Sequence, residues 1–214
     1  MLEGIRGVIF DLDGVLCSTD EYHYRAWKSL ADSLGIAFDR TENCRLRGVS
    51  REESLEIILE KATKEYSAEE KQQMCTYKNH LYRAFLAELS DRDLFPGVLE
   101  MFCELRRFGL KLAVGSSSKN AGYILQKLRI ENLFDAVVDG NDISHSKPHP
   151  EVFLRTAGLL GLSSEQCVVV EDAHAGIVAA KAGGFCVFAI GDACSDPLAD
   201  GDLKQLSDFV KLLC

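Results

Sequence analysis

The sequence predicts an α/β fold: a parallel β-sheet with helices on both faces and a separate helical cap. Two observations predict it. Short apolar runs alternate with segments of helical periodicity, an order typical of parallel strands joined by helices. One interval, residues 18–91, has helical patterns and no good strand. We therefore expect a Rossmann-like core domain, residues 1–17 and 92–214, with a helical cap domain, residues 18–91, inserted after the first strand.

The predicted strands are short and continuously apolar, as strands buried on both faces are. They cover residues 6–10, 110–114, 136–138, 167–170 and 186–189. Helical patterns in the core cover residues 97–108, 119–128, 150–160, 174–182 and 203–212, and those in the cap cover residues 20–34, 51–64 and 68–89. Ser67 and Glu70 form a capping-box pattern at the start of the last cap helix. The chain crosses between the domains near residues 17–20 and 90–93, and we expect hinges there.

The composition excludes several classes of protein. Hydrophobic residues make up 47% of the chain, enough for a packed core, and the net charge of −9 argues against nucleic-acid or anionic-membrane binding. None of the eight cysteines forms a C-x-x-C pair, and no run approaches the ~20 apolar residues that a membrane span needs. The start of the chain has no signal-peptide pattern. We expect a cytoplasmic monomer with reduced cysteines.

Polar side chains follow four of the predicted strands, at the point where each strand ends. In chain order they are Asp11 and Asp13, then Ser116, Ser117, Ser118, Lys119 and Asn120, then Ser146, Lys147 and Pro148, then Glu171 and Asp172. Ligands of open α/β sheets gather at the carboxyl ends of the strands. We therefore expect these residues to form one site.

The residue types of this site fit phosphoryl transfer. Asp11, Asp13 and Asp172 make an oxygen cluster of the kind that binds Mg²⁺, and the ion would relieve the repulsion within the D-L-D stretch. Strand alternation points Asp11 and Asp13 to one side, so one carboxylate could attack phosphorus while the other handles protons. Ser116 and Lys147 are suited to holding the phosphate.

Each motif alone also has an ordinary structural interpretation. A D-x-D pair is common in loops, S-S-S-K-N is typical of a capped turn, and S-K-P is typical of a turn before a helix. His23, Arg51 and Lys78 could be solvated helix residues, and Trp27 could be part of the cap core. The other histidines are expected to be surface or turn residues: His80, His145, His149 and His174. The order of the motifs at successive strand ends favours the functional interpretation.

The core motifs D-L-D-G-V, G-S-S-S, S-K-P and E-D-A-x-A-G-I resemble those of the haloacid dehalogenase superfamily. Residues 19–27 (T-D-E-Y-H-Y-R-A-W), 48–56 (G-V-S-R-E-E-S-L-E) and 78–79 (K-N) narrow the resemblance to the β-phosphoglucomutase family. The resemblance implies a Mg²⁺-dependent phosphohexomutase that interconverts β-glucose 1-phosphate and glucose 6-phosphate. The reaction would pass through an aspartyl-phosphate and a sugar bisphosphate, glucose 1,6-bisphosphate.

The resemblance also implies a role for each site residue. Asp11 would be the nucleophile and Asp13 the general acid/base. Asp11, Asp172 and the backbone carbonyl of Asp13 would hold Mg²⁺, with Glu171 close by. Ser116 and Lys147 would hold the transferring phosphate. The second phosphate would be bound by Arg51, Ser118 and Asn120, and the sugar and the closed cap would involve His23, Gly48, Val49 and Lys78.

Two other functions stay open at this point. In a sugar-phosphate phosphatase on the same scaffold, water would intercept the aspartyl-phosphate. A catalytically silent phosphosugar-binding protein is the second alternative, and the intact carboxylates Asp11, Asp13 and Asp172 argue against it. The chain departs from the family pattern at Cys17 and Ser18, where Thr and Asp are common, and at Ser117, where Ala is usual. These departures concern the hinge more than the chemistry.

Overall fold

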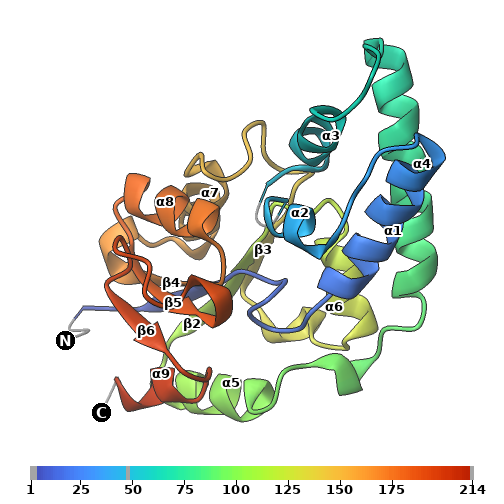
Figure 1. Ribbon diagram of the computed structural model, residues 1–214. Coiled ribbons are helices and arrows are strands. Elements are labelled where there is room, and N and C mark those ends of the chain that lie inside the picture. The colour runs from blue at the N-terminus through green and yellow to red at the C-terminus, as the bar shows by residue number, and fades with distance from the viewer. Residues whose placement is uncertain (1–3, 47–48, 213–214) are drawn as a thin grey trace.

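The computed structural model describes residues 4–46 and 49–212. Its centre is a six-stranded sheet in the order β3-β2-β1-β4-β5-β6, in which every neighbouring pair is parallel (Figure 1). The strands are β1 Gly7–Phe10, β2 Lys111–Gly115, β3 Ala136–Val138, β4 Cys167–Glu171, β5 Cys186–Ile190 and β6 Gly201–Leu203. The predicted fold class is confirmed, and the five predicted strands are present with ends shifted by at most one residue.

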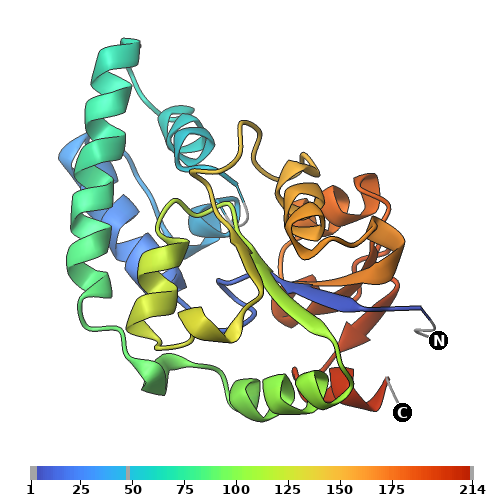
Figure 2. The ribbon, with the colours of Figure 1, turned by 180° about the vertical axis from the view of Figure 1, so that it is seen from behind.

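Helices cover both faces of the sheet. On one face Val8 and Phe10 pack with residues of three helices: α5 Val98–Arg107, α6 Ala121–Lys127 and α9 Asp208–Lys211. On the other face Ile9 packs with residues of α7 Glu151–Leu160 and α8 His174–Ala182. Figures 1 and 2 show α5 with α9 on one side of the sheet and α7 with α8 on the other. Because successive strand residues point to opposite faces, burial on both sides explains the continuous apolar strands.

The C-terminal segment differs from the prediction of one helix over residues 203–212. Leu203 ends the edge strand β6, and only Asp208–Lys211 is helical. Leu203, Leu206 and Phe209 are all buried in one core cluster. Their three-residue spacing imitates a helix face, but here a short strand, a turn and one helical turn supply the same three contacts.

The cap consists of helices inserted after β1. They are α1 Asp20–Ser33, α2 Arg40–Cys44, α3 Arg51–Leu59 and α4 Ala68–Leu86. Helices α1 and α4 pack together (Figure 1), and Trp27, Leu30, Leu55 and Ile58 belong to a core cluster of the cap's own. The apolar faces of the cap helices are therefore largely buried against one another.

The cap helices agree with the predicted ones apart from their ends. The capping box of Ser67 and Glu70 is present, and Ser50 and Glu53 form a second one at the start of α3. Helix α3 ends at Leu59, before residue 64, and α4 ends at residue 86, before residue 89. The short helix α2 was not predicted, because five residues are too few for a periodic pattern. Four 3₁₀ helices complete the described secondary structure: η1 Asp91–Asp93, η2 Glu131–Leu133, η3 Ser164–Gln166 and η4 Gly191–Ala193.

The two segments that cross between core and cap lie side by side. Cys17 is fully buried and forms isolated β-bridges with Asp13 and with Leu94. The backbone N–H of Phe95 donates to the carbonyl of Leu16 at 2.9 Å. We propose that these paired segments separate a core domain, residues 1–17 and 92–214, from a cap domain, residues 18–91. No helix within residues 4–46 and 49–212 has the length and apolar character to cross a bilayer.

Candidate active site

A cavity of about 340 Å³ lies at the carboxyl edge of the sheet, where core residues and cap residues face each other. The strand order changes direction here, because β2 and β4 lie on opposite sides of β1, and ligands of open α/β sheets bind at such points. Predicted site residues on its wall are Asp11, Asp13, His23, Val49, Arg51, Lys78, Ser116, Ser118, Asn120, Lys147 and Asp172. Glu171 lies behind this wall, and Gly48 lies outside the described residues.

At the core end of the cavity, the side chain of Lys147 is buried between two carboxylates. This end is formed by Asp11, Asp13, Lys147, Glu171 and Asp172. Lys147 is 1% exposed, and its Nζ donates to Asp11 Oδ1 at 2.6 Å and to Glu171 Oε1 at 2.5 Å. Burial by itself would lower the pKa of Lys147, but the two carboxylates raise it above its usual value. Lys147 is therefore charged and fixes one oxygen of Asp11.

The remaining carboxylates of the core end give the site the character of a metal centre. Ligand oxygens of Asp11, Glu171 and Asp172 lie within 4.8 Å of one another. Burial, followed by the charges of Glu171 and Asp11, raises the pKa of Asp172 to about 9. Four carboxylates with one lysine leave an excess of negative charge, which a divalent cation with oxygen preference would balance. The residues therefore fit Mg²⁺.

Two glycines allow these carboxylates to approach the backbone. Gly14 has φ +86°, and a Cβ on it would lie 1.9 Å from Asp172 Oδ2. A Cβ on Gly176, in α8, would lie 1.9 Å from Glu171 Oε1. Glu171 Oε2 in turn accepts from the N–H groups of Asp172 and Ala173 at 2.9 and 3.0 Å. Oε1 of Glu171 is bound by the buried ammonium group of Lys147, which would compete with a metal ion, so Asp172 is the more available metal ligand.

Asp13 is held by Thr19, at the first crossing into the cap. The backbone N–H of Thr19 donates to Asp13 Oδ1 at 2.6 Å, and its hydroxyl donates to Asp13 Oδ2. Because the Thr19 proton is used there, the hydroxyl of Tyr82 donates to Thr19 Oγ1, 2.7 Å away. Burial raises the pKa of Asp13 to about 6, although the two hydrogen bonds from Thr19 oppose the rise. A carboxyl group with this pKa can exchange a proton near neutral pH.

The cap end of the cavity, formed by His23, Arg51 and Lys78, is basic. Lys78 is 2% exposed, its Nζ lies 2.8 Å from His23 Nδ1, and it lies over the rings of Trp27 and Tyr82 at 4.6 Å. Burial, and then the charge of Arg51, lowers the pKa of Lys78 well below its usual value. When Lys78 is charged it can only donate, so Nδ1 of His23 accepts. His23 Nε2 then faces Asp13 Oδ2 at 3.8 Å.

The junction of core and cap carries the residues predicted to hold a second phosphate. Arg51 is the first residue of α3, behind the Ser50 capping box. The hydroxyl of Ser118 accepts from the N–H of Asn120 at 3.2 Å, and Asn120 Nδ2 donates to Asn79 Oδ1 at 2.9 Å. Ser116 is buried, and its hydroxyl accepts from the N–H of Ser118 at 3.2 Å.

Sequence reasoning missed some residues of this site. Thr19 precedes a helix and has the residue type of an N-cap, yet its side chain makes no cap hydrogen bond and instead binds Asp13. Tyr82 lies four residues after Lys78 and therefore on the same face of α4, a spacing that could have indicated it. Glu52 was also missed: it lines the cavity and forms an ion pair of 2.9 Å with Lys119, a residue that the strand-end pattern had already included. Only the folded chain brings that pair together.

Comparison with known proteins agrees with this geometry. The family model described as haloacid dehalogenase-like hydrolase matches residues 8–190. The β-phosphoglucomutase of Bacillus subtilis is 43% identical over 96% of this chain and 92% of its own length. A phosphorylated carbohydrates phosphatase of Thermotoga maritima is 32% identical, over 85% of this chain and 82% of its own.

Solved structures show the same architecture. The crystal structure of a β-phosphoglucomutase from Clostridium difficile superposes with a TM-score of 0.90 at 36% identity, covering 95% of this chain and 92% of the other. The family match spans β1 to β5, with the cap inserted between β1 and β2. The chain therefore belongs to the haloacid dehalogenase-like hydrolase family.

Proposed function

We propose that this enzyme is a Mg²⁺-dependent phosphohexomutase that interconverts β-glucose 1-phosphate and glucose 6-phosphate. The observation that carries the proposal is a single cavity with two unlike ends. Its core end has Asp11, Asp13 and Lys147, whereas its cap end and junction have Arg51 with Ser118 and Asn120. A sugar bisphosphate needs two phosphate sites at once. A simple monophosphate phosphatase needs one.

The chemistry at the core end uses two aspartates in sequence. A carboxylate oxygen of Asp11 forms a bond to phosphorus as the bond between phosphorus and the sugar oxygen breaks. Asp13 gives its proton to that departing oxygen, and takes a proton from the attacking hydroxyl in the reverse step. Bound Mg²⁺ would reduce the negative charge that Asp11, Asp172 and the phosphate bring together. Lys147 keeps Asp11 oriented through its 2.6 Å contact.

The cap end converts phosphoryl transfer into a mutase reaction. With one phosphate at Asp11, the second lies at the junction, where the guanidinium of Arg51 fits phosphate oxygens. After one transfer the bisphosphate intermediate, glucose 1,6-bisphosphate, turns around and presents its other phosphate to Asp11. His23, Lys78 and the backbone near Val49 contact the sugar or stabilise the closed cap. Closure over the cavity reduces the access of water, which would otherwise hydrolyse the aspartyl-phosphate.

The relatives support the mutase and also explain the alternative. The 43% identity to the Bacillus subtilis β-phosphoglucomutase extends over nearly the whole chain. A fructose-1-phosphate phosphatase of Escherichia coli is 31% identical over 86% of this chain, so the same scaffold also carries phosphatases. The basic cap end favours the mutase, because it provides the second phosphate site.

The test supplies β-glucose 1-phosphate, Mg²⁺ and catalytic glucose 1,6-bisphosphate, and measures glucose 6-phosphate and free phosphate in the same samples. We expect glucose 6-phosphate as the main product. Chelation of the metal should abolish the reaction, and added Mg²⁺ should restore it. Free phosphate without glucose 6-phosphate would favour the phosphatase, and full activity in excess chelator would contradict the assignment of the carboxylates as a metal site.

A further inference from the structure

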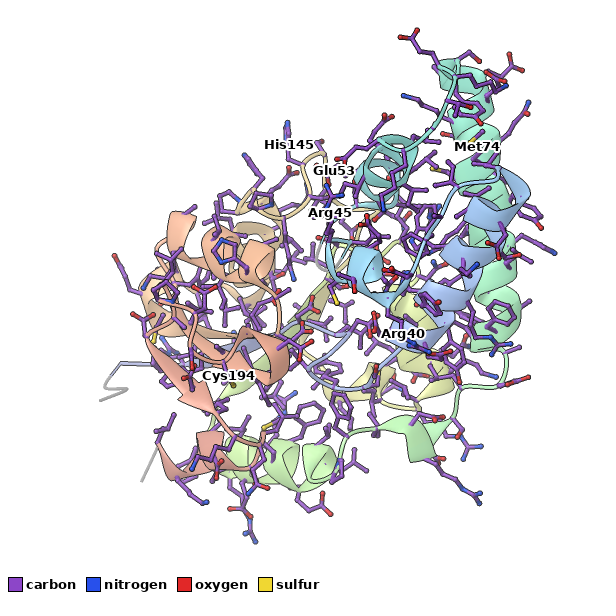
Figure 3. The ribbon with its side chains drawn as sticks, in the orientation of Figure 1. Arg40, Arg45, Glu53, Met74, His145 and Cys194 are labelled. Atoms are coloured by element: carbon purple, nitrogen blue, oxygen red, sulfur yellow. The ribbon has the colours of Figure 1, made fainter. Side chains whose placement is uncertain are left out.

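A second group of metal-ligand side chains lies outside the cavity, at the start of α7. One ligand atom each of His145, His149 and Glu151 lies within 4.8 Å of the others. Within residues 4–46 and 49–212, this group and the one at Asp11, Glu171 and Asp172 are the two that meet this criterion. Figure 3 shows His145 on the segment before α7, with its side chain directed outward.

The local structure holds the three side chains together. Glu151 is the first residue of α7, and its carboxylate accepts from the backbone N–H groups of Ser144 and His145 at 3.0 and 2.9 Å. Nδ1 of His145 lies 3.0 Å from Glu151 Oε2, and Nδ1 of His149 accepts from the N–H of Glu151 at 3.3 Å. The two imidazole rings have centroids 4.7 Å apart. The carboxylate is thus fixed, with both rings beside it.

This donor set differs in kind from the carboxylates of the cavity. Two imidazole nitrogens and one carboxylate oxygen suit zinc and neighbouring transition metals, whereas Mg²⁺ takes oxygen ligands. Three protein ligands leave further positions for water, and His145, whose side chain is 66% exposed, faces solvent. We propose that His145, His149 and Glu151 form a binding site for a divalent transition-metal ion of the zinc class, separate from the Mg²⁺ site.

The proposed metal site lies beside a residue of the cavity. Ser146, Lys147 and Pro148 lie between the two histidines, and Lys147 contacts Asp11. An ion bound by both histidines would link the two ends of the segment 145–149, which contains Lys147. It would restrain the segment that presents the lysine to the cavity.

Binding is tested by titrating Zn²⁺ into the full chain by calorimetry in the presence of excess Mg²⁺. The titration is repeated with His145→Ala/His149→Ala and with Asp172→Asn, which weakens the carboxylate site in the cavity. His80→Ala is the matched control, because it removes an exposed imidazole elsewhere. We expect one zinc ion per chain at these residues. Its affinity should fall at least about tenfold in the double variant and stay unchanged in the Asp172 variant and the control.

Electron paramagnetic resonance of bound Cu²⁺ identifies the ligands independently. Coupling to imidazole nitrogen is expected in the wild type and in Asp172→Asn, and should disappear in the double histidine variant. A wild type that binds no Zn²⁺ would overturn the proposal. So would a double variant that binds Zn²⁺ as tightly as the wild type, or a zinc ion that is lost in Asp172→Asn.

Discussion

The two ends of the cavity carry groups of opposite kind, acidic at the core end and basic at the cap end, and these groups are stabilised in different ways. At the core end, burial and neighbouring carboxylates raise the pKa of Asp172, and Lys147 is the buried counter-charge. At the cap end, burial and Arg51 lower the pKa of Lys78, which lies against two aromatic rings. At each end, therefore, burial and neighbouring charges of the same sign favour the neutral form of an ionisable side chain: Asp172 at the core end and Lys78 at the cap end.

The difference indicates how a bisphosphate would use the site. The acidic core end can accept a phosphate only when a cation offsets its carboxylates. In the proposed function, the basic cap end binds a phosphate without a metal. A bisphosphate bound at both ends would link the cap to the core through its sugar. The following changes test this contrast, in order of decreasing expected effect.

Replacing Asp11, the proposed nucleophile at the core end, has the largest expected effect. Asp11→Asn keeps the size of the side chain and removes the attacking charge, so turnover should fall by at least about 10⁴-fold. A labelled phosphoryl donor should mark the wild type at Asp11 through an acid-stable, base-labile bond, and the variant should carry no label. Asp32→Asn, on α1 where Asp32 pairs with Lys28, is the control. Label on another residue of the wild type would refute the role of Asp11.

Removing the guanidinium of Arg51, at the junction of core and cap, should lower mutase activity more than simple phosphoryl transfer. The proposed bidentate contact of Arg51 with phosphate would contribute about 1.5–3 kcal/mol, so Arg51→Ala should lower mutase turnover at least about tenfold. Phosphoryl transfer from acetyl phosphate, which has no second phosphate, should fall much less. Arg45→Ala removes an exposed arginine that pairs with Glu60 within the cap, and serves as the control. Equal losses with both substrates would contradict a second phosphate site at Arg51.

Neutralising Asp172 should stabilise the metal-free protein. Its pKa is about 9 in the folded state, against 3.8 for the free side chain. The folded protein therefore holds a proton that the unfolded chain loses, and stability from this group falls as pH rises from about 4 to about 9. The free energy of unfolding of Asp172→Asn should exceed that of the wild type by about 1–3 kcal/mol at pH 8 and by less at pH 5.

Urea unfolding at both pH values, with and without Mg²⁺, checks this prediction. Mg²⁺ should reduce the difference in the free energy of unfolding between Asp172→Asn and the wild type, since it binds the folded wild type. If this difference in the free energy of unfolding does not depend on pH, ionisation of the Asp172 carboxyl group is not its cause.

Breaking the ion pair of Glu52 and Lys119, between cap and core, should have the smallest effect. Glu52 and Lys119 are each more than 40% exposed, so their pair contributes about 0.2–1 kcal/mol. Glu52→Gln should lower kcat/KM by less than about fivefold, and the loss should disappear at high salt. Glu56→Gln, which removes a pair with Lys71 inside the cap, should leave kcat/KM unchanged. A loss that persists in high salt would mean that Glu52 acts by another route.

The predicted elements failed where local pattern and tertiary contact diverge. The leucine and phenylalanine spacing of residues 203–212 imitates a helix, but pairing with β5 draws Gly201–Leu203 into the sheet. Helix α2 is too short to show a period. His145 and His149 are exposed turn residues, as predicted, but their proximity to the carboxylate of Glu151 is seen only in the folded turn.

The sequence by itself determined the first five strands and most of the helices along the chain, the insertion of the cap helices after the first strand and the motifs at the strand ends. These depend on periodicity and on residues close in the chain, which local physics fixes. The tertiary structure decided which side chains contact each other. Lys147 contacts Asp11, 136 residues away in the sequence, and Lys78 contacts His23, 55 residues away. The side chain of Thr19 binds Asp13 instead of capping the helix that follows it. Burial and charge act over distances in space. Only the packed fold could therefore set which carboxyl groups gain protons and which cations lie beside them.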